Sequence, residues 1–260
     1  MKLFFCLISL LSFNLYADTC NQHLSFIVKD KSNSIDQVLC NDGYAVGYSY
    51  YYKAPIYVQY RLTKENVLEN NGRGNNPFKE DSRIPEKFRA TLSDYKYSGY
   101  DRGHMAPRAA IDQTALTRDE SFLMSNMTPQ EAKLNQKGWA KLESYVRDLA
   151  IIHNEIYVIT GSLFEGVNKT IGQDVYVPSH LYKIIYIPGK DKMIAFLIEN
   201  KAFDIVDLKS KQVKVSYLQN HSGLDFFQNI VNVEEKVMEK SELNYCSILG
   251  QGHLKPESCE

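Results

Sequence analysis

The sequence has no hydrophobic run long enough to cross a bilayer and no excess of charge of either sign. The longest apolar run, LFFCLISLLSF near the N-terminus, is shorter than the roughly 20 residues that a transmembrane helix needs. Its 30 Lys and Arg residues stand against 31 Asp and Glu residues, a formal net charge of -1. This balance argues against a protein that coats nucleic acid through bulk electrostatics, and it is compatible with an enzyme that has a local basic cleft.

Common metal-binding and redox motifs are also missing. The sequence contains no CxxC pair, and none of its 6 histidines stands in an HExxH motif. No linker, internal repeat or low-complexity tract divides the chain. We therefore expect a single domain over residues 18–260, after a leader over residues 1–17.

The N-terminal segment and the cysteines predict an exported protein. Lys2 precedes the apolar run and Ala17 precedes a polar segment, as in a secretory signal peptide. Its removal leaves an even number of cysteines, which favours two disulfides. Their positions near the two chain ends predict Cys20–Cys40 and Cys246–Cys259, although four cysteines allow three pairings. We expect a secreted or periplasmic protein with no membrane span in its mature form.

Several segments have the composition of β-strands. Residues 44–62 (YAVGYSYYYKAPIYVQYRL) follow an Asn-Asp-Gly turn and are rich in Tyr and Val, which predicts a hairpin or meander. The runs EIYVITG, YKIIYIPG and KMIAFLIEN are short and β-branched, and SFLMSN is expected to form a buried strand. Strands with only a few helices indicate an α+β fold.

One helix is indicated by residues 135–150, NQKGWAKLESYVRDLA, and residues 232–243 have a weaker helical pattern. The apolar residues of the first segment recur at the spacing of one buried face, namely Trp139, Leu142, Val146 and Leu149. The segment TPQE upstream supplies a start signal, and Asn135 could itself be the cap. On a wheel of about 100° per residue, Asn135 lies near the centre of the apolar face. A buried amide needs a partner, either a backbone group or a metal ion in a cleft.

The segment GYDRGHMAPRAA places Asp101, Arg102 and His104 side by side, between two glycines and a proline. On the helical wheel, Glu143 and Arg147 lie on one flank of the predicted helix. Together these residues supply a base, a carboxylate, an amide oxygen and several cations. Hydrolysis of a phosphodiester needs a base for water, a divalent ion and cations for the developing negative charge.

These segments resemble the DNA/RNA non-specific endonuclease family. The resemblance rests on YDRGHMAP followed by SFLMSNMTPQEAKLNQKGWAKLESYVRDLA, with further similarity in GRGNNPFKED and SGLDFF, and it covers about residues 40–230. It implies a ββα-metal (His-Me finger) core embedded in a larger, mainly antiparallel sheet flanked by helices. Residues 231–260 form a C-terminal extension with no counterpart. The activity implied is Mg²⁺-dependent hydrolysis of DNA and RNA to 5′-phosphorylated products, with Mn²⁺ as a possible substitute.

The resemblance also implies roles for the base and the metal ligands. His104 would be the general base that activates the attacking water. Asn135 would be the only direct protein ligand of one Mg²⁺ ion, and water would complete the coordination shell of this reluctantly dehydrated ion. Glu143 would hold one of those water molecules.

Further residues would contact the phosphate or support the site. Arg147 would reach the scissile phosphate or the leaving group, and Arg102 would contact phosphate or brace its loop. Asn126 would stabilise the surroundings of the site. An upstream arginine is expected near the phosphate, for which Arg73 fits best and Arg83 is a weaker choice.

Simpler interpretations exist for most of these residues. His104 could be a loop imidazole bonded to a carbonyl, Asn135 a helix cap, and Arg102 a structural residue. Glu143 and Arg147 stand four residues apart in the order that favours a solvated ion pair.

Other features stay open at the level of the sequence. Tyr48, Tyr50, Tyr51 and Tyr52 could stack nucleobases, although packing on a sheet is the simpler interpretation. Arg108 stands where many relatives have a small residue, and we expect it to lie away from the chemistry. A non-catalytic secreted nucleic-acid-binding protein, or a nuclease that prefers RNA or DNA, is the alternative function. A homodimer and an inhibitor protein are both possible.

Overall fold

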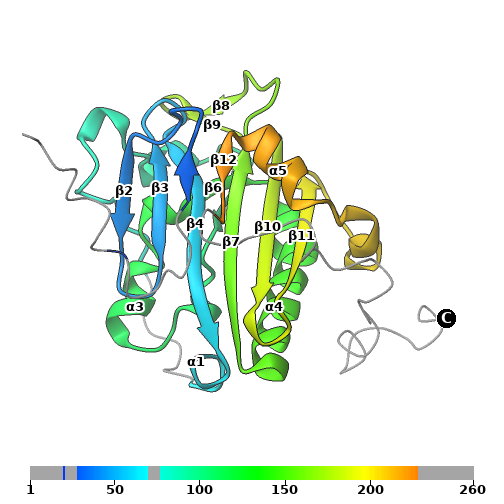
Figure 1. The fold of residues 1–260 in the computed structure, drawn as a ribbon. Coiled ribbons are helices and arrows are strands. Elements are labelled where there is room, and N and C mark those ends of the chain that lie inside the picture. Colours follow the sequence, from blue (N-terminus) through cyan, green and yellow to red (C-terminus); the bar gives the residue numbers. More distant parts are fainter. Residues whose placement is uncertain (1–19, 21–27, 70–76, 228–260) are drawn as a thin grey trace, which may run out of the picture.

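The computed structural model describes residues 20, 28–69 and 77–227 (Figure 1). Four of the sequence predictions lie outside these residues. They are the signal peptide over residues 1–17, the phosphate contact of Arg73, the helix over residues 232–243 and the Cys246–Cys259 disulfide.

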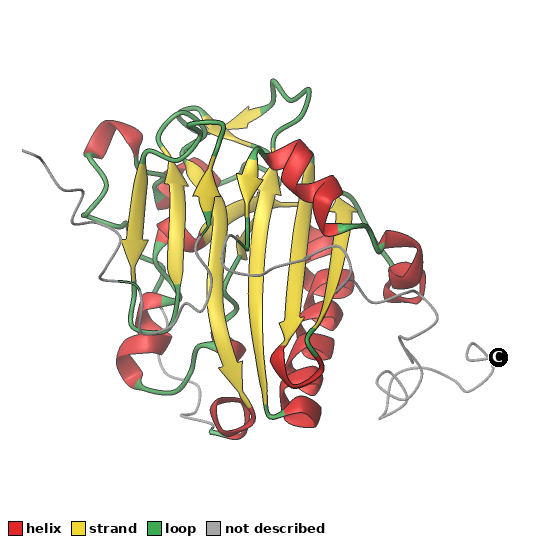
Figure 2. Ribbon diagram, in the orientation of Figure 1, coloured by secondary structure: helices red, strands yellow, loops and turns green. Residues whose placement is uncertain are grey.

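A six-stranded antiparallel sheet forms the centre of the molecule (Figures 1 and 2). Its strand order is β11-β10-β7-β4-β3-β2. The strands are β2 (Gln37–Cys40), β3 (Ala45–Ser49), β4 (Ala54–Thr63), β7 (Glu155–Leu163), β10 (His180–Ile187) and β11 (Lys192–Glu199). The predicted strand segments after the Asn-Asp-Gly turn and in the three later apolar runs are confirmed.

Helices cover both faces of this sheet. In Figure 1, α4 (Ala140–His153) lies behind the sheet, and α5 (Val215–Ser222) with β12 (Leu224–Asp225) lies in front of it. Behind the sheet, Trp139 and Leu142 pack in one cluster with Ile185 of β10. In front of it, Leu218 packs in a second cluster with Ile184, the neighbouring residue of β10. Strand β10 is therefore buried on both sides, which explains its nearly continuous apolar sequence.

Smaller elements complete the described part of the fold. They are β1 (Lys29–Asp30), α1 (Lys64–Leu68), η2 (Glu86–Phe88), α2 (Leu92–Tyr95), η3 (Arg108–Ala110), α3 (Ala115–Glu120), β8 (Thr170–Ile171), β9 (Val175–Tyr176), η6 (Pro188–Lys190) and η7 (Ile205–Lys211). Among the residues described, no helix has the length and apolar content needed to cross a membrane.

A separate two-stranded hairpin precedes the long helix. Strand β5 (Asp101–His104) pairs antiparallel with β6 (Met127–Gln130), so that Asp101 lies opposite Gln130 and His104 opposite Met127. The prediction of a strand at SFLMSN was wrong, because Met124–Asn126 form a short 3-10 turn (η4) and the strand begins only at Met127. The hairpin and the following helix form the ββα unit.

The helix begins with a π-helical turn, η5 (Leu134–Trp139), which runs directly into α4. Glu131 caps this start, since its Oε2 accepts a hydrogen bond of 2.8 Å from the Leu134 N–H. Asn135 is not the cap, because its own N–H already donates to the Glu131 carbonyl at 2.9 Å. π-Turns are rare and occur frequently at functional sites.

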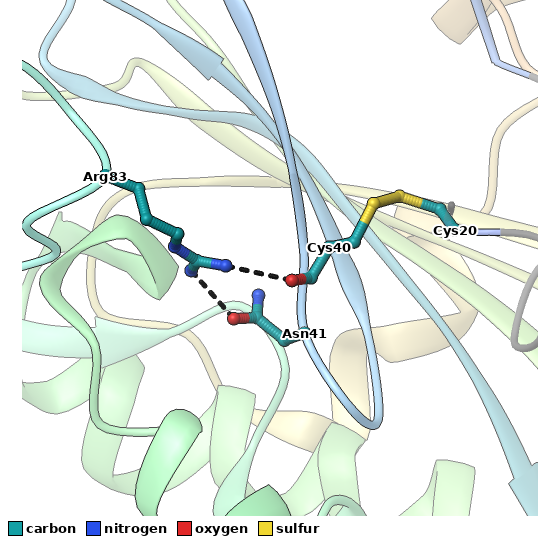
Figure 3. The surroundings of a disulfide bond; sticks show 4 residues. All are labelled: Cys20, Cys40, Asn41 and Arg83. Atoms are coloured by element: carbon teal, nitrogen blue, oxygen red, sulfur yellow. Dashed lines mark hydrogen bonds between the residues drawn. A yellow bond between two sulfur atoms is a disulfide. The ribbon is translucent and has the colours of Figure 1, made fainter. Parts of the chain in front are cut away.

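The predicted disulfide between Cys20 and Cys40 is confirmed (Figure 3). Arg83 anchors the strand that carries Cys40, donating to the Cys40 carbonyl at 2.9 Å and to Asn41 Oδ1 at 2.8 Å (Figure 3). The same guanidinium pairs with Asp81 at 2.6 Å. These bonds give Arg83 a structural role, and its place as the weaker alternative for the upstream phosphate-binding arginine stays a prediction.

Candidate active site

The β5–β6 hairpin fixes the position of the DRGH segment. Gly103 lies so close to Gln130 that an added Cβ would fall 2.0 Å from the Gln130 Cδ atom. Gln130 is fully buried and cannot withdraw. The close strand pairing therefore requires glycine at position 103, and His104 follows at the end of the strand.

His104 sits between two aromatic rings. Its ring centroid lies 5.6 Å from that of Phe78 and 5.2 Å from that of Phe122. The Nε2 atom is buried and has no hydrogen-bond partner among the residues described. Burial, followed by the charges of Arg108 and Arg102, lowers the pKa of His104 to about 4. The imidazole is therefore neutral at pH 7 and able to accept a proton.

Arg108 lies closer to this imidazole than the sequence indicated. Its charge is the second cause of the lowered pKa of His104, after burial. Arg108 is itself held by Asp112, with Nη1 2.6 Å from Oδ2. Our expectation that Arg108 lies away from the chemistry was therefore wrong, because a fixed cation so close to the imidazole opposes its protonation.

A carboxylate on the hairpin orients the amide on the π-turn. Asn135 Nδ2 donates to Asp101 Oδ2 at 2.9 Å, and Gln136 Nε2 donates to the same oxygen at 2.7 Å. An ionised carboxylate only accepts hydrogen bonds, so the amide nitrogen of Asn135 must face Asp101. The Asn135 Oδ1 atom then faces away from Asp101, where it can serve as a ligand of a metal ion.

A cleft of about 480 Å³ opens beside these groups, and its lining includes Phe78, Tyr95, Lys96, Asp101, Arg102 and Asn135. Arg102 is held within it by a cation–π contact, with its guanidinium carbon 4.2 Å from the Phe78 centroid. His104 is not among the described residues that line this cleft, although its ring contacts Phe78, which does. The structure thus joins Arg102 and Asn135 in one cleft and places His104 directly behind Phe78.

Asn126 braces the chain that follows His104. Its Oδ1 accepts from the Ala106 N–H at 2.9 Å, and its Nδ2 donates to the carbonyls of Ala106 at 2.9 Å and Ser121 at 2.8 Å. The side chain is completely buried. Asn126 therefore positions the backbone two residues after the imidazole and does not reach the cleft.

Glu143 and Arg147 are half-buried residues of α4, and Glu143 lies within electrostatic range of Lys183. Burial of its carboxylate raises the pKa of Glu143, against the opposing charges of Lys183 and Arg147. Lys183 is completely buried, and its Nζ bonds Thr160 Oγ1 at 2.5 Å. Glu143 and Arg147 are both half-buried, so an ion pair between them would be only partly solvated. The structure groups these residues with Lys183, apart from the residues that line the cleft.

Several of these residues could not be identified from the sequence. Phe78 and Phe122 carry no local motif that marks them as neighbours of the imidazole. Tyr95 ends the short helix α2 before the DRGH motif, and no sequence pattern marks it as part of a site. Lys183 gave a usable signal, because a lysine within the buried run YKIIYI must find a partner in the interior. Of the four tyrosines predicted to pack on the sheet, the prediction is confirmed for Tyr48, which is fully buried, and wrong for Tyr51, which is 67% exposed.

The donor set fits a hydrated hard cation. No group of three or more His, Cys, Asp or Glu side chains that could hold a metal ion occurs in the described ranges. An amide oxygen suits Mg²⁺, which usually keeps most of its water ligands and binds through one or two protein oxygens. The oriented Oδ1 of Asn135 offers such a ligand at the edge of the cleft.

The hairpin, the helix and the antiparallel sheet together define an α+β endonuclease fold with a ββα core. The chain belongs to the DNA/RNA non-specific endonuclease family, whose sequence model matches residues 21–232. Members of this family are metal-dependent nucleases.

Individual relatives agree with this assignment. The chain is 34% identical to Nuclease C1 of Cunninghamella echinulata var. echinulata, over 73% of this chain and 82% of that protein. It is 30% identical to mitochondrial Endonuclease G of Homo sapiens, over 75% of this chain and 71% of that protein. A chain in the crystal structure of the EndoG/EndoGI complex has a similar fold, with a TM-score of 0.71 and 32% identity, covering 78% of this chain and 90% of that chain.

Proposed function

We propose that this protein is an exported, Mg²⁺-dependent and sugar-non-specific endonuclease that cleaves DNA and RNA to 5′-phosphorylated products. The observation that carries the proposal is the neutral imidazole of His104, placed behind a cleft that holds Arg102 and the oriented amide oxygen of Asn135. A base, a cation and a ligand for a hard metal ion are the groups that phosphodiester hydrolysis needs.

His104 takes a proton from the attacking water in this proposal. Because its pKa lies far below 7, the imidazole is neutral at pH 7, and one of its two ring nitrogens is free to accept a proton. The water oxygen forms a bond to phosphorus, and the bond between phosphorus and O3′ breaks. The products are a 5′-phosphate and a 3′-hydroxyl whose oxygen has taken up a proton. Arg102, held against Phe78, stabilises negative charge on the phosphate oxygens.

Asn135 would hold the Mg²⁺ ion through Oδ1, and Mn²⁺ could replace it. The bound cation would supply charge neutralisation at the phosphate and lower the pKa of a coordinated water. We assign Glu143 to a water ligand of this ion and Arg147 to the phosphate or the leaving group.

Export is supported by two features of the chain. Residues 1–17 have the pattern of a secretory signal peptide. The Cys20–Cys40 disulfide is of a kind that persists in oxidising compartments and is rare in the cytosol. Both features support the proposed periplasmic or secreted location.

A gel assay on purified protein tests the proposed activity. Plasmid DNA and RNA should both be degraded with Mg²⁺ and remain intact with a chelator. His104→Ala should lose about 10²- to 10⁴-fold in rate, the usual contribution of a general base. The variant should keep the circular dichroism spectrum and melting temperature of the wild type.

His221→Ala is the matched control, because this histidine is exposed on α5, on the opposite face of the sheet. It should cleave at the wild-type rate. Full activity of His104→Ala would refute the assignment of the base. Binding of nucleic acid without cleavage, under any divalent metal between pH 5 and 9, would instead establish the non-catalytic alternative.

A further inference from the structure

Tyr97 is an exposed aromatic residue held in an unfavourable backbone conformation. Its exposed fraction is 95%, and its φ angle is 59°. A left-handed conformation costs a bulky residue about 1–2 kcal/mol, and glycine or asparagine normally occupies it. Neither burial nor packing compensates for the strain at Tyr97. Strained residues of this kind cluster at ligand-binding sites.

The backbone around Tyr97 is firmly held. Asp94 Oδ2 caps α2 by accepting from the Thr91 N–H at 2.7 Å, and Asp94 Oδ1 accepts from the Gln173 N–H at 2.7 Å. Ser98 Oγ donates to the Tyr95 carbonyl at 2.9 Å. The loop between β8 and β9 therefore braces the segment from one side, and Tyr97 projects from an ordered turn into solvent.

The residues on either side of Tyr97 connect it to the cleft. Lys96 lines the cleft, and its Nζ atom lies 5.2 Å from the centroid of the Tyr97 ring. Tyr100 lines the same cleft, and Lys169 Nζ lies 4.8 Å from its ring. The Lys96 side chain therefore lies between the Tyr97 ring and the cleft.

Tyr95 provides a second, independent indication of a ligand. It is 6% exposed and lines the cleft, yet its hydroxyl has no hydrogen-bond partner within the described residues. Burial raises the pKa of Tyr95 well above its usual value, so the hydroxyl stays protonated and can donate. A buried hydroxyl without a partner is energetically unfavourable unless a ligand satisfies it. Lys96 and Arg102 line the same cleft and supply positive charge suited to phosphate oxygens.

We propose that Tyr97 is the stacking platform for the nucleobase of an unpaired nucleotide, whose phosphate binds Lys96 in the cleft. The proposal rests on the proposed nuclease function and specifies how its substrate is held. In a duplex both faces of a base are covered by its stacked neighbours, so a solvent-exposed ring can stack only on an unpaired or terminal base. The site therefore favours single-stranded nucleic acid or unpaired ends.

Kinetics on matched substrates test this platform. A single-stranded oligonucleotide and the duplex of the same sequence are cleaved by the full chain with Tyr97 intact or replaced. Tyr97→Ala should raise KM for the single strand by about 5- to 10-fold, the lower part of the range for base–aromatic stacking because the ring is open to solvent. Tyr97→Trp, which keeps an aromatic face, should stay within about twofold of the wild type. Tyr217→Ala, an exposed tyrosine on α5, is the control and should change neither substrate.

Tyr97→Gly separates the stacking role from a structural one. Glycine accepts the positive φ angle, so this variant should melt about 2–4 °C above Tyr97→Ala. Both variants lack the ring, so both should show the same rise in KM. If Tyr97 had a purely structural role, the less stable variant would have the higher KM. If both variants kept the KM of the wild type, the proposal would be overturned.

Stacking itself is visible by fluorescence in the absence of cleavage. A single strand that carries 2-aminopurine should lose fluorescence when it binds the His104→Ala variant, which keeps Tyr97. It should keep its fluorescence when it binds the double variant with His104→Ala and Tyr97→Ala. Unchanged fluorescence in both proteins would refute the platform even if the wild type is an active nuclease. Quenching without any cleavage by the wild type would support the platform and refute the nuclease proposal.

Discussion

Asp101 controls which atom of the Asn135 amide faces the cleft. Its Oδ2 holds the amide nitrogens of both Asn135 and Gln136. We predict that Asp101→Ala frees the Asn135 amide to rotate and weakens Mg²⁺ binding about 10- to 100-fold, as loss of a hydrogen-bond partner of a metal ligand commonly does. Two measurements check this: the Mg²⁺ concentration that gives half-maximal rate, and direct Mn²⁺ binding by electron paramagnetic resonance without substrate.

Gln136→Ala is the matched control for Asp101. It removes the second donor to the same carboxylate oxygen and leaves the Asn135 bond in place. Its metal affinity should stay within about twofold of the wild type. Equal weakening in Asp101→Ala and Gln136→Ala would mean that the carboxylate acts on the π-turn as a whole and does not orient the Asn135 amide.

For single residues, the sequence pattern identifies candidates that stand close together in the chain and does not identify those that are recruited from a distance. His104, Arg102 and Asn135 stand in recognisable spacing, and the structure places the last two in one cleft. Arg83 illustrates the limit, because its partners Cys40 and Asn41 lie more than 40 residues away and bind it through backbone and amide oxygens. No sequence pattern encodes such a contact.

At the scale of elements, the β5–β6 hairpin depends on the absence of a side chain at Gly103. An alanine Cβ would fall 2.0–2.4 Å from the Gln130 side chain, which is fully buried. We predict that Gly103→Ala lowers the free energy of unfolding by about 1–3 kcal/mol, the usual effect of overpacking. Urea denaturation measures this. Gly189→Ala, where no atom lies within 4 Å, should stay within about 0.5 kcal/mol of the wild type.

A double substitution tests the physical reason for this effect. Gln130→Ala opens the space that the new Cβ of Gly103→Ala would occupy. The coupling energy of the pair should therefore be favourable and larger than about 0.5 kcal/mol. Purely additive losses would show that position 103 needs glycine for its backbone and not for the approach of Gln130.

Strands were predicted more reliably than the start of the long helix, and the π-turn explains why. The alternating and apolar runs that became β4, β7, β10 and β11 follow directly from side-chain burial. The helical wheel assumed about 100° per residue, whereas Leu134–Trp139 form a wider turn with less rotation per residue. Asn135 was therefore placed on the apolar face, while the structure turns it to Asp101 and the cleft.

For the molecule as a whole, the sequence predicts the class of fold. It does not predict that the two faces of the central sheet differ in polarity. The front cluster around Leu218 and Phe226 is apolar, whereas the interior beneath α4 also contains Lys183 and Thr160. A buried charge of this kind is stable only when it is paired and hydrogen-bonded. The side of the sheet that carries the candidate site is thus the polar one, a division that requires the three-dimensional arrangement of strands β4, β7 and β10.

The Cys20–Cys40 disulfide stabilises the molecule as a whole. It closes a loop between cysteines 20 positions apart and joins Cys20 to Cys40 on the edge strand β2. Loop closure of this length contributes about 3 kcal/mol by restricting the unfolded chain. We predict that replacing Cys20 and Cys40 together by serine lowers the melting temperature by about 6–12 °C. Calorimetry under oxidising conditions measures this.

Nuclease activity well below the melting temperature should survive in the double serine variant, since Arg83 still binds the Cys40 backbone carbonyl and Asp81. Cys246 and Cys259 remain in this variant. Any further loss of melting temperature when it is reduced would therefore report a second disulfide between them. Identical melting of wild type and variant would show that the first disulfide does not constrain the unfolded chain, and a variant that folds normally but has lost activity would instead make the disulfide part of the site.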